Sequence, residues 1–225
     1  SGTKVGTVTV SMENTTFADG DFTGTIFTGR YDLGENDTMM TMVLKALEIG
    51  GYKWNGYETL TSDSYTKTTY IASISKDGKS LGEFSGGKQS GWMGTLNDWF
   101  TNEGFASFSV KNGKLADGDI ISIKYTSVGL GEDVGGTWSN SDTTLKSLTF
   151  DGDGNPRLTT TFEPGKRGGT YTYTLVIDGD SSNLTVTPTA ANKNFLVKTF
   201  LNEKVTSNAE GSSFYKRTES IPVVA

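Results

Sequence analysis

The chain has 225 residues, of which 34% are hydrophobic, 11% aromatic and 20% charged, a composition that supplies enough apolar side chains for packed cores and excludes a disordered chain. The formal net charge is −6 and Lys and Arg are scattered singly, which argues against a nucleic-acid interface and against binding to an anionic membrane surface. Cysteine and histidine are absent, which excludes disulfides, thiolate metal sites, cysteine nucleophiles and histidine-dependent triads, and leaves carboxylates, Lys or Tyr for any catalysis.

The first predicted element is a strand near the N-terminus. Val8, Val10 and Met12 alternate with hydroxyl-bearing residues, and this period of two is typical of a strand with one buried face. Residues 14–20 are rich in turn formers, and 23–33 is a weaker candidate strand because glycines interrupt it.

One helix is predicted next. Asn36 or Asp37 is the expected N-cap, because either side chain can accept hydrogen bonds from free amides of the first turn. Apolar residues then recur at the spacing of one helical face: Met40, Val43, Leu44 and Leu47. The pair Gly50-Gly51 tolerates positive φ and predicts the C-terminal end.

After the helix the sequence returns to short strands and turns. The candidate strands are 70–74 and 121–125, the candidate turns are 76–79 and 116–119, and 90–100 is dense in large apolar residues. The last strand is the clearest, because Ile121, Ile123 and Tyr125 alternate with polar residues. One helix packed on a small mixed sheet predicts an α+β domain.

A change in composition divides the chain near residue 140. Residues 129–142 are rich in Gly, Ser and Asn and are typical of a linker or an extended loop. Beyond them no helical period appears, and short alternating strands return, most cleanly in Tyr171, Tyr173, Leu175 and Ile177. We therefore predict a mostly β chain in two domains, an α+β domain over 1–140 and a small β-sandwich over 141–225.

The two ends of the sequence are typical of a piece excised from a longer protein. Ser1-Gly2 resembles a remnant of cloning, and the apolar run 221–225 looks cut rather than terminal. No apolar stretch approaches the roughly 20 residues of a membrane span. Other domains of the longer protein are therefore expected partners, and no membrane span is predicted in this piece.

Several spaced motifs are similar to the transcobalamin C-terminal-like domain of bacterial surface proteins. They are Ser90-Gly91-Trp92-Met93, Leu96-Asn97, Phe100, Ala116-Asp117-Gly118-Asp119-Ile120, Tyr125 and Leu130-Gly131-Glu132-Asp133-Val134-Gly135-Gly136. The predicted helix stands where that family has its single helix, so the resemblance covers about residues 4–137. It implies a β-grasp-like fold related to soluble ligand-binding modules, with cobalamin as a candidate ligand.

A shorter set of motifs resembles the bacterial cadherin-like β-sandwich domain over about residues 143–225. The set is Leu145-Lys146-Ser147-Leu148-Thr149-Phe150, Phe162-Glu163-Pro164 and Tyr171-Thr172-Tyr173-Thr174-Leu175. This resemblance implies a spacer or adhesion module on a cell surface.

The densest group of large apolar residues is the leading candidate for a ligand site. Trp92, Met93, Trp99 and Phe100 can form a flat apolar platform, with Asn97 beside it to meet the amides on the rim of a corrin. The same side chains can equally fill the core of a small domain. Exposure of the aromatic rings favours a binding role, and full burial favours a purely structural stalk.

A second candidate site is a calcium loop. Asp151, Asp153 and Asn155 have the alternate spacing of oxygen ligands in such loops. The EF-hand pattern fails, however, because Pro156 and Phe162 stand where that motif needs Gly and Glu. A Gly-rich β-turn is the alternative for the same residues.

Three further hypotheses compete with these. Sugar rings can stack on Trp54 or Trp99, which makes a glycan a rival ligand. A glycosidase needs only two carboxylates, but no spacing singles out a pair among Glu58, Asp63, Glu83, Asp98 and Glu103. Lys198, Asn202 and Glu203 are the residue types of an internal Lys–Asn isopeptide link.

The sequence thus predicts a non-enzymatic, secreted or cell-surface module for binding or adhesion. Its candidate ligand is a small molecule such as cobalamin, held by the first domain, while the second domain spaces or connects it. The alternatives are a carbohydrate-binding module and a purely structural spacer of a larger surface protein.

Overall fold

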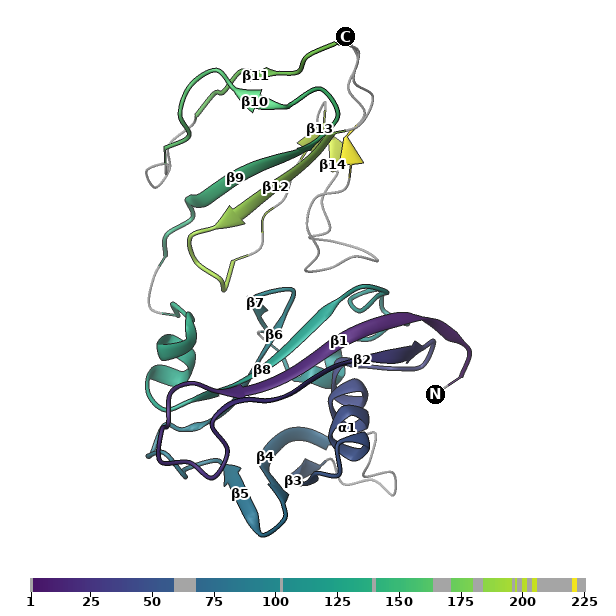
Figure 1. The fold of residues 1–225 in the computed structure, drawn as a ribbon, viewed down its shortest axis with the longest axis vertical. Coiled ribbons are helices and arrows are strands. Elements are labelled where there is room, and N and C mark those ends of the chain that lie inside the picture. Colours follow the sequence, from purple (N-terminus) through teal and green to yellow (C-terminus); the bar gives the residue numbers. More distant parts are fainter. Residues whose placement is uncertain are drawn as a thin grey trace.

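The computed structural model describes residues 2–58, 68–101, 103–138, 141–163, 171–179, 184–195, 197, 200–201, 204–205 and 220–221. Within them the fold is mostly β, with one α-helix, α1 (Met39–Ile49), and two short 3-10 helices, η1 (Phe105–Ser107) and η2 (Gly129–Val134) (Figure 1). This confirms the mostly β, α+β fold class. The strands are β1 (Lys4–Asn14), β2 (Gly24–Gly34), β3 (Lys53–Glu58), β4 (Thr68–Lys76), β5 (Lys79–Gly82), β6 (Gly91–Leu96), β7 (Trp99–Phe100), β8 (Ile120–Thr126), β9 (Leu145–Gly152), β10 (Arg157–Leu158), β11 (Leu175–Val176), β12 (Leu184–Ala190), β13 (Phe200–Leu201), β14 (Lys204–Val205) and β15 (Ser220–Ile221).

A five-stranded mixed sheet is the framework of the N-terminal part, which we define as residues 2–138. Its order is β2-β1-β8-β6-β7, and β1 and β8 are its parallel neighbours. Their register aligns Val10 with Ile121 and Met12 with Ile123. Because side chains alternate across a strand, the apolar residues of both strands point to one face of the sheet.

That apolar face packs against α1 and a second sheet of order β3-β4-β5. In Figure 1, α1 and β3–β5 lie on the same side of the five-stranded sheet. The helix buries eight residues: Met39, Met40, Thr41, Met42, Val43, Leu44, Ala46 and Leu47. Unbranched methionines adapt their shape to irregular gaps, which suits a core between a helix and two differently oriented sheets.

The helix begins one residue later than predicted. Thr38, not Asn36 or Asp37, is the N-cap: its hydroxyl accepts from the Thr41 backbone N–H at 3.1 Å, and the Thr41 hydroxyl accepts from the Thr38 N–H at 2.8 Å. Asp37 is buried beside it and accepts from the Gly34 N–H at 2.7 Å. Its carboxylate thus fixes the connection from β2 to α1 instead of capping the helix.

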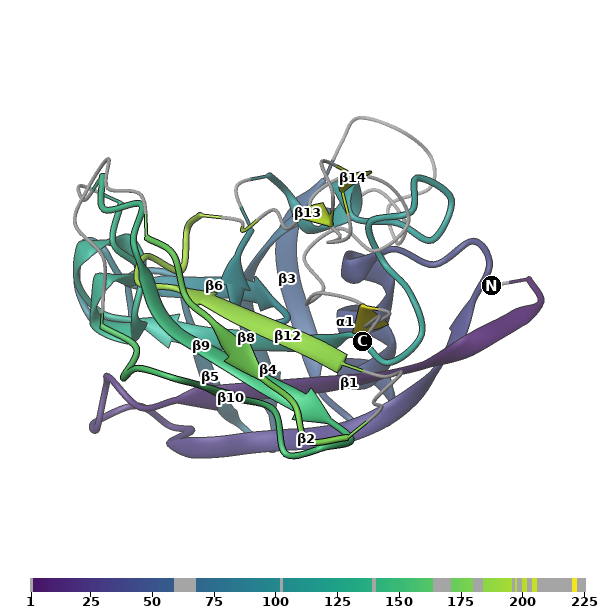
Figure 2. The same ribbon diagram turned by 90° about the horizontal axis from the view of Figure 1, so that it is seen from above.

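In the C-terminal part, defined as residues 141–221, the described residues form three small sheets of order β15-β12-β9, β10-β11 and β13-β14. Every strand pair in the described residues joins strands of the same part. The predicted boundary near residue 140 falls at Ser139-Asn140, outside the described residues. Viewed from above, β9 and β12 cross over the five-stranded sheet (Figure 2). In the described part of the chain, no helix is long and apolar enough to cross a membrane.

Candidate functional site

The predicted platform residues are divided between the core and the surface. Trp92 is 2% exposed: its ring meets that of Tyr125 edge-on at 5.1 Å between centroids, and its Nε1 donates to the Leu81 carbonyl at 3.3 Å. Phe100 is also 2% exposed. Met93 is half-buried and points to the opposite face from Trp92, because neighbouring residues of a strand alternate. The structure therefore does not gather the five predicted residues into one exposed platform.

The hairpin between β6 and β7 explains where Asn97 lies. Asn97 and Asp98 have φ values of 51° and 70°, as a two-residue type I′ turn requires. The Ile120 N–H donates to Asn97 Oδ1 at 2.8 Å, and Asn97 Nδ2 donates to the buried Asp119 at 3.1 Å. The Asn97 amide expected beside a corrin is thus committed to holding the hairpin against β8.

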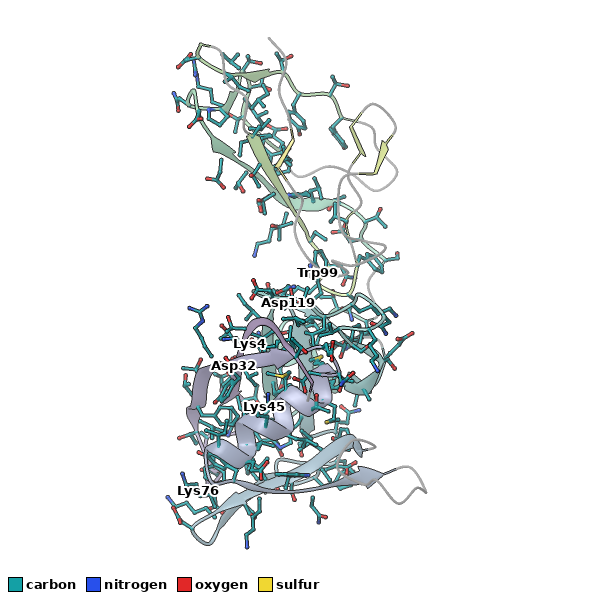
Figure 3. All side chains as sticks on the ribbon, turned by 90° about the vertical axis from the view of Figure 1, so that its right-hand side faces the viewer. Lys4, Asp32, Lys45, Lys76, Trp99 and Asp119 are labelled. Atoms are coloured by element: carbon teal, nitrogen blue, oxygen red, sulfur yellow. The ribbon has the colours of Figure 1, made fainter. Side chains whose placement is uncertain are left out.

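The half-buried Trp99 lies at the end of the N-terminal part that faces the C-terminal part (Figure 3). It lines a small groove of about 40 Å³ between the two parts. The other lining residues are Asn97, Asp98, Pro188, Thr189, Ala190 and Lys193. Pockets that enclose a drug-sized ligand have volumes of roughly 300–1,000 Å³, so this groove can grip the edge of a ligand but cannot enclose a corrin.

The loop after β12 contacts the N-terminal part at one side of this groove, and we call its residues 191–195 the clamp. Lys193 Nζ donates to Asp98 Oδ1 at 3.0 Å, and the Phe100 N–H donates to the Lys193 carbonyl at 3.2 Å. The Thr137 N–H donates to Asn194 Oδ1 at 2.9 Å. We call this contact region, built from 97–100, 131–138 and 188–195, the junction. Charged and backbone hydrogen bonds hold it, so both parts contribute to one surface.

The loop of the clamp is itself well ordered by hydrogen bonds. Asn192 is 1% exposed; its Nδ2 donates to the Thr137 carbonyl at 3.1 Å and its Oδ1 accepts from the Asn194 N–H at 2.9 Å. Hydrogen bonds from the side chain and backbone of Thr144 hold the pKa of Asp142 below its usual value. The Ala191 N–H donates to the Thr144 carbonyl at 2.9 Å, which ties the clamp to the start of the C-terminal part.

Two buried polar atoms at the junction have no hydrogen-bond partner among the described residues. They are Thr137 Oγ1 and Asn194 Nδ2, one from each side of the contact. A buried polar group without a partner costs about 1–3 kcal/mol, and a bound water or ion is one explanation for such a group in a native protein. The Asn194 group directly follows Lys193, which lines the groove.

An exposed tryptophan stands at the edge of the junction. Trp138 is 41% exposed, its Nε1 donates to the Leu130 carbonyl at 2.8 Å, and its ring meets that of Phe100 at 5.9 Å between centroids. The sequence-based prediction missed this residue. The available signal was a single large aromatic residue inside a polar, Gly-rich segment, where connecting loops often carry function.

An arginine side chain lies near the predicted calcium loop. Arg157 forms a two-pronged ion pair with Asp178, at 3.1 Å from Nη1 to Oδ2 and 3.0 Å from Nη2 to Oδ1. Asp151 lies in β9, and both Asp151 and Asp153 are exposed. Among the described residues no three acidic side chains gather as a metal site, so the structure adds no ligand to Asp151, Asp153 and Asn155.

The residues that the sequence suggested for a glycan site, a glycosidase or an isopeptide link are scattered over the chain. Trp54 is half-buried on β3, away from Trp99. Of the five carboxylates, Asp98 is paired with Lys193, Glu103 lies 3.5 Å from Lys114, and Glu83 is half-buried. The Glu58 side chain and Asp63 lie outside the described residues. So do Lys198, Asn202 and Glu203, the candidates for an isopeptide link.

Comparisons with known proteins add no identification. No protein-family model matches the chain, and a search of curated proteins found no match. The two family resemblances therefore depend on the motif residues quoted for them.

Proposed function

We propose that this chain is a non-enzymatic binding module of a secreted or cell-surface protein, and that its ligand binds at the junction. The observation that carries the proposal is the groove between the two parts, lined by Trp99 and by the Lys193–Asp98 ion pair. The buried atoms Thr137 Oγ1 and Asn194 Nδ2, which have no hydrogen-bond partner among the described residues, lie in the same junction.

The chemistry around the groove supports binding of a polar organic molecule. The Lys193–Asp98 pair supplies a donor and an acceptor, and both side chains remain partly exposed, at 33% and 55%. Trp99 lines the groove and Trp138 stands at the junction's edge. Ligand sites typically combine such aromatic surface with a few placed polar groups.

The non-enzymatic part of the proposal is supported by residue chemistry. The chain has no histidine or cysteine, and the carboxylate of the junction, Asp98, is neutralised by Lys193. The secreted or cell-surface location is supported by the two family resemblances.

A binding comparison between Lys193→Ala and Lys114→Ala tests the proposal. Both lysines are partly exposed and paired with a carboxylate, but Lys114 pairs with Glu103 away from the groove. Cyanocobalamin and a panel of neutral oligosaccharides are titrated by calorimetry up to millimolar concentration. We expect at least one probe to bind the wild type and the Lys114→Ala variant equally, and to bind Lys193→Ala at least fivefold more weakly.

Two results would refute the proposal. One is a wild type that binds no probe. The other is a probe that binds Lys193→Ala as tightly as the wild type, which places the ligand elsewhere. The first result favours a purely structural spacer, an alternative that the burial of Trp92 and Phe100 supports, since those rings then serve only to stabilise the fold.

A further inference from the structure

Trp138 is an exposed aromatic surface with a fixed orientation. It keeps 41% of its surface exposed although its Nε1 is bonded to the Leu130 carbonyl at 2.8 Å. Because the polar edge of the indole is turned toward the protein, the exposed remainder is mostly the carbon surface of the rings. Exposure of this apolar surface to water is unfavourable in free energy, and a ligand that covers the surface removes that cost.

Gly136 allows the indole to lie this close to the backbone. A Cβ at Gly136 would lie 3.0 Å from Trp138 Nε1, whereas one at Gly131 would be in ordinary van der Waals contact with the same atom, at 3.6 Å. Gly131 also has φ of 106°, which L-residues avoid. Phe100, buried beneath, braces the ring at 5.9 Å. A side chain held in this way loses little further freedom when a ligand binds.

Hydrogen-bonding groups of both kinds lie beside the segment that carries this ring. A Cβ at Gly135 would lie 3.5 Å from Lys193 Nζ, so the Lys193–Asp98 pair lies beside that segment. Glu132, from η2, is an exposed carboxylate within it. The segment therefore has an ammonium donor and carboxylate acceptors near it.

We propose that Trp138 is a stacking platform for a pyranose sugar, with Lys193 and Asp98 binding the hydroxyls at the rim of that sugar. This names the ligand class of the junction and rests on the proposed function. A pyranose presents an apolar face of C–H groups, which packs on an aromatic ring, and a rim of hydroxyls that both donate and accept. A lipid chain fits poorly, since desolvating the Lys193–Asp98 pair without hydrogen bonds is costly.

The test compares Trp138→Ala and Trp138→Phe with Phe84→Ala as the matched control. Phe84 is another exposed aromatic, at 62%, on the β5–β6 connection. Oligosaccharides of β-linked glucose, N-acetylglucosamine and mannose are titrated by calorimetry, and each variant is checked for wild-type folding by circular dichroism. We expect Trp138→Ala to weaken sugar binding at least tenfold, Trp138→Phe to retain most of it and Phe84→Ala to retain all of it.

Tryptophan fluorescence gives a second measurement, independent of calorimetry. A sugar stacked on Trp138 changes its emission, so wild type and Trp138→Phe must differ in their response to the same titration. Should cyanocobalamin bind in a Lys193-dependent manner while no sugar binds, the sugar assignment is wrong and the proposed function stands. Sugar binding that Trp138→Ala leaves unchanged also overturns the assignment, and failure of every probe overturns both proposals.

Discussion

The burial of Trp92 indicates that its ring belongs to the core and not to an exposed platform. Its replacement should therefore lower the free energy of unfolding substantially. Its ring is buried at 2% exposure between β5, β6 and β8, with Tyr125 at 5.1 Å and a hydrogen bond to the Leu81 carbonyl. Removing a buried tryptophan side chain costs about 3–5 kcal/mol because it leaves a cavity. Small proteins have about 5–15 kcal/mol of stability in total, so Trp92→Ala should lose a large share of the free energy of unfolding.

Trp92→Phe separates the two contributions. It keeps an aromatic ring against Tyr125 but leaves the Leu81 carbonyl without the indole donor, which costs about 1–3 kcal/mol for a buried acceptor. Trp138→Phe is the control, because it removes the same indole N–H from a site that is 41% exposed. We expect that control to cost less than about 1 kcal/mol.

Urea denaturation followed by tryptophan fluorescence is the appropriate assay. All four tryptophans of the chain lie at or before residue 138, so their emission follows unfolding of the N-terminal part and of its junction with the C-terminal part. The expected order of stability loss is Trp92→Ala, Trp92→Phe, Trp138→Phe. If Trp92→Ala were as stable as the wild type to within about 0.5 kcal/mol, the ring could not be part of a packed core, and the burial argument would be wrong.

Three further changes have definite expected outcomes. Thr38→Ala removes the N-cap hydroxyl of α1 and should lower the free energy of unfolding in urea by about 1 kcal/mol; no change would contradict the capping assignment. Burial raises the pKa of Tyr31 above its ordinary value of 10.0. The contribution of Tyr31 to stability is therefore complete below pH 10.0 and is lost as pH rises through the folded pKa. In Tyr31→Phe the free energy of unfolding, followed by circular dichroism, should fall less steeply with pH over that alkaline range. EDTA and added calcium should each leave the melting temperature unchanged, because Arg157 already neutralises Asp178 beside the 151–155 loop; stabilisation by calcium that EDTA reverses would instead establish the predicted metal site.

Local periodicity was sufficient to predict much of the N-terminal part. The alternation of Val8, Val10 and Met12 corresponds to β1, and the face containing Leu44 and Leu47 corresponds to α1. These patterns work because burial of one face determines which positions are apolar. The N-cap was misassigned because Asp37 and Thr38 are both good capping residues, and only the contact with Gly34 decides between them.

The candidate site could be predicted far less well, because it depends on contacts between distant segments. Lys193 meets Asp98 across 95 positions of sequence, and no local pattern pairs two such common residues. The density of aromatic residues around Trp92 suggested a ligand platform, yet density alone does not say whether a ring faces the core or the solvent. Trp138 was overlooked because it lies in a Gly-rich segment, and the composition of that segment predicts only a flexible linker.

The parallel pairing of β1 with β8 has a consequence for how the protein is made. β1 is synthesised before the neighbour that covers its second edge, Ile120–Thr126, which follows more than a hundred residues later. Until then β1 can pair only with β2, and its other edge remains open to wrong partners. Closure of such a long loop makes folding slow, so a nascent or translocating chain that ends before Thr126 should be a substrate for chaperones, and deletion of β8 should cause aggregation rather than a shortened but stable protein.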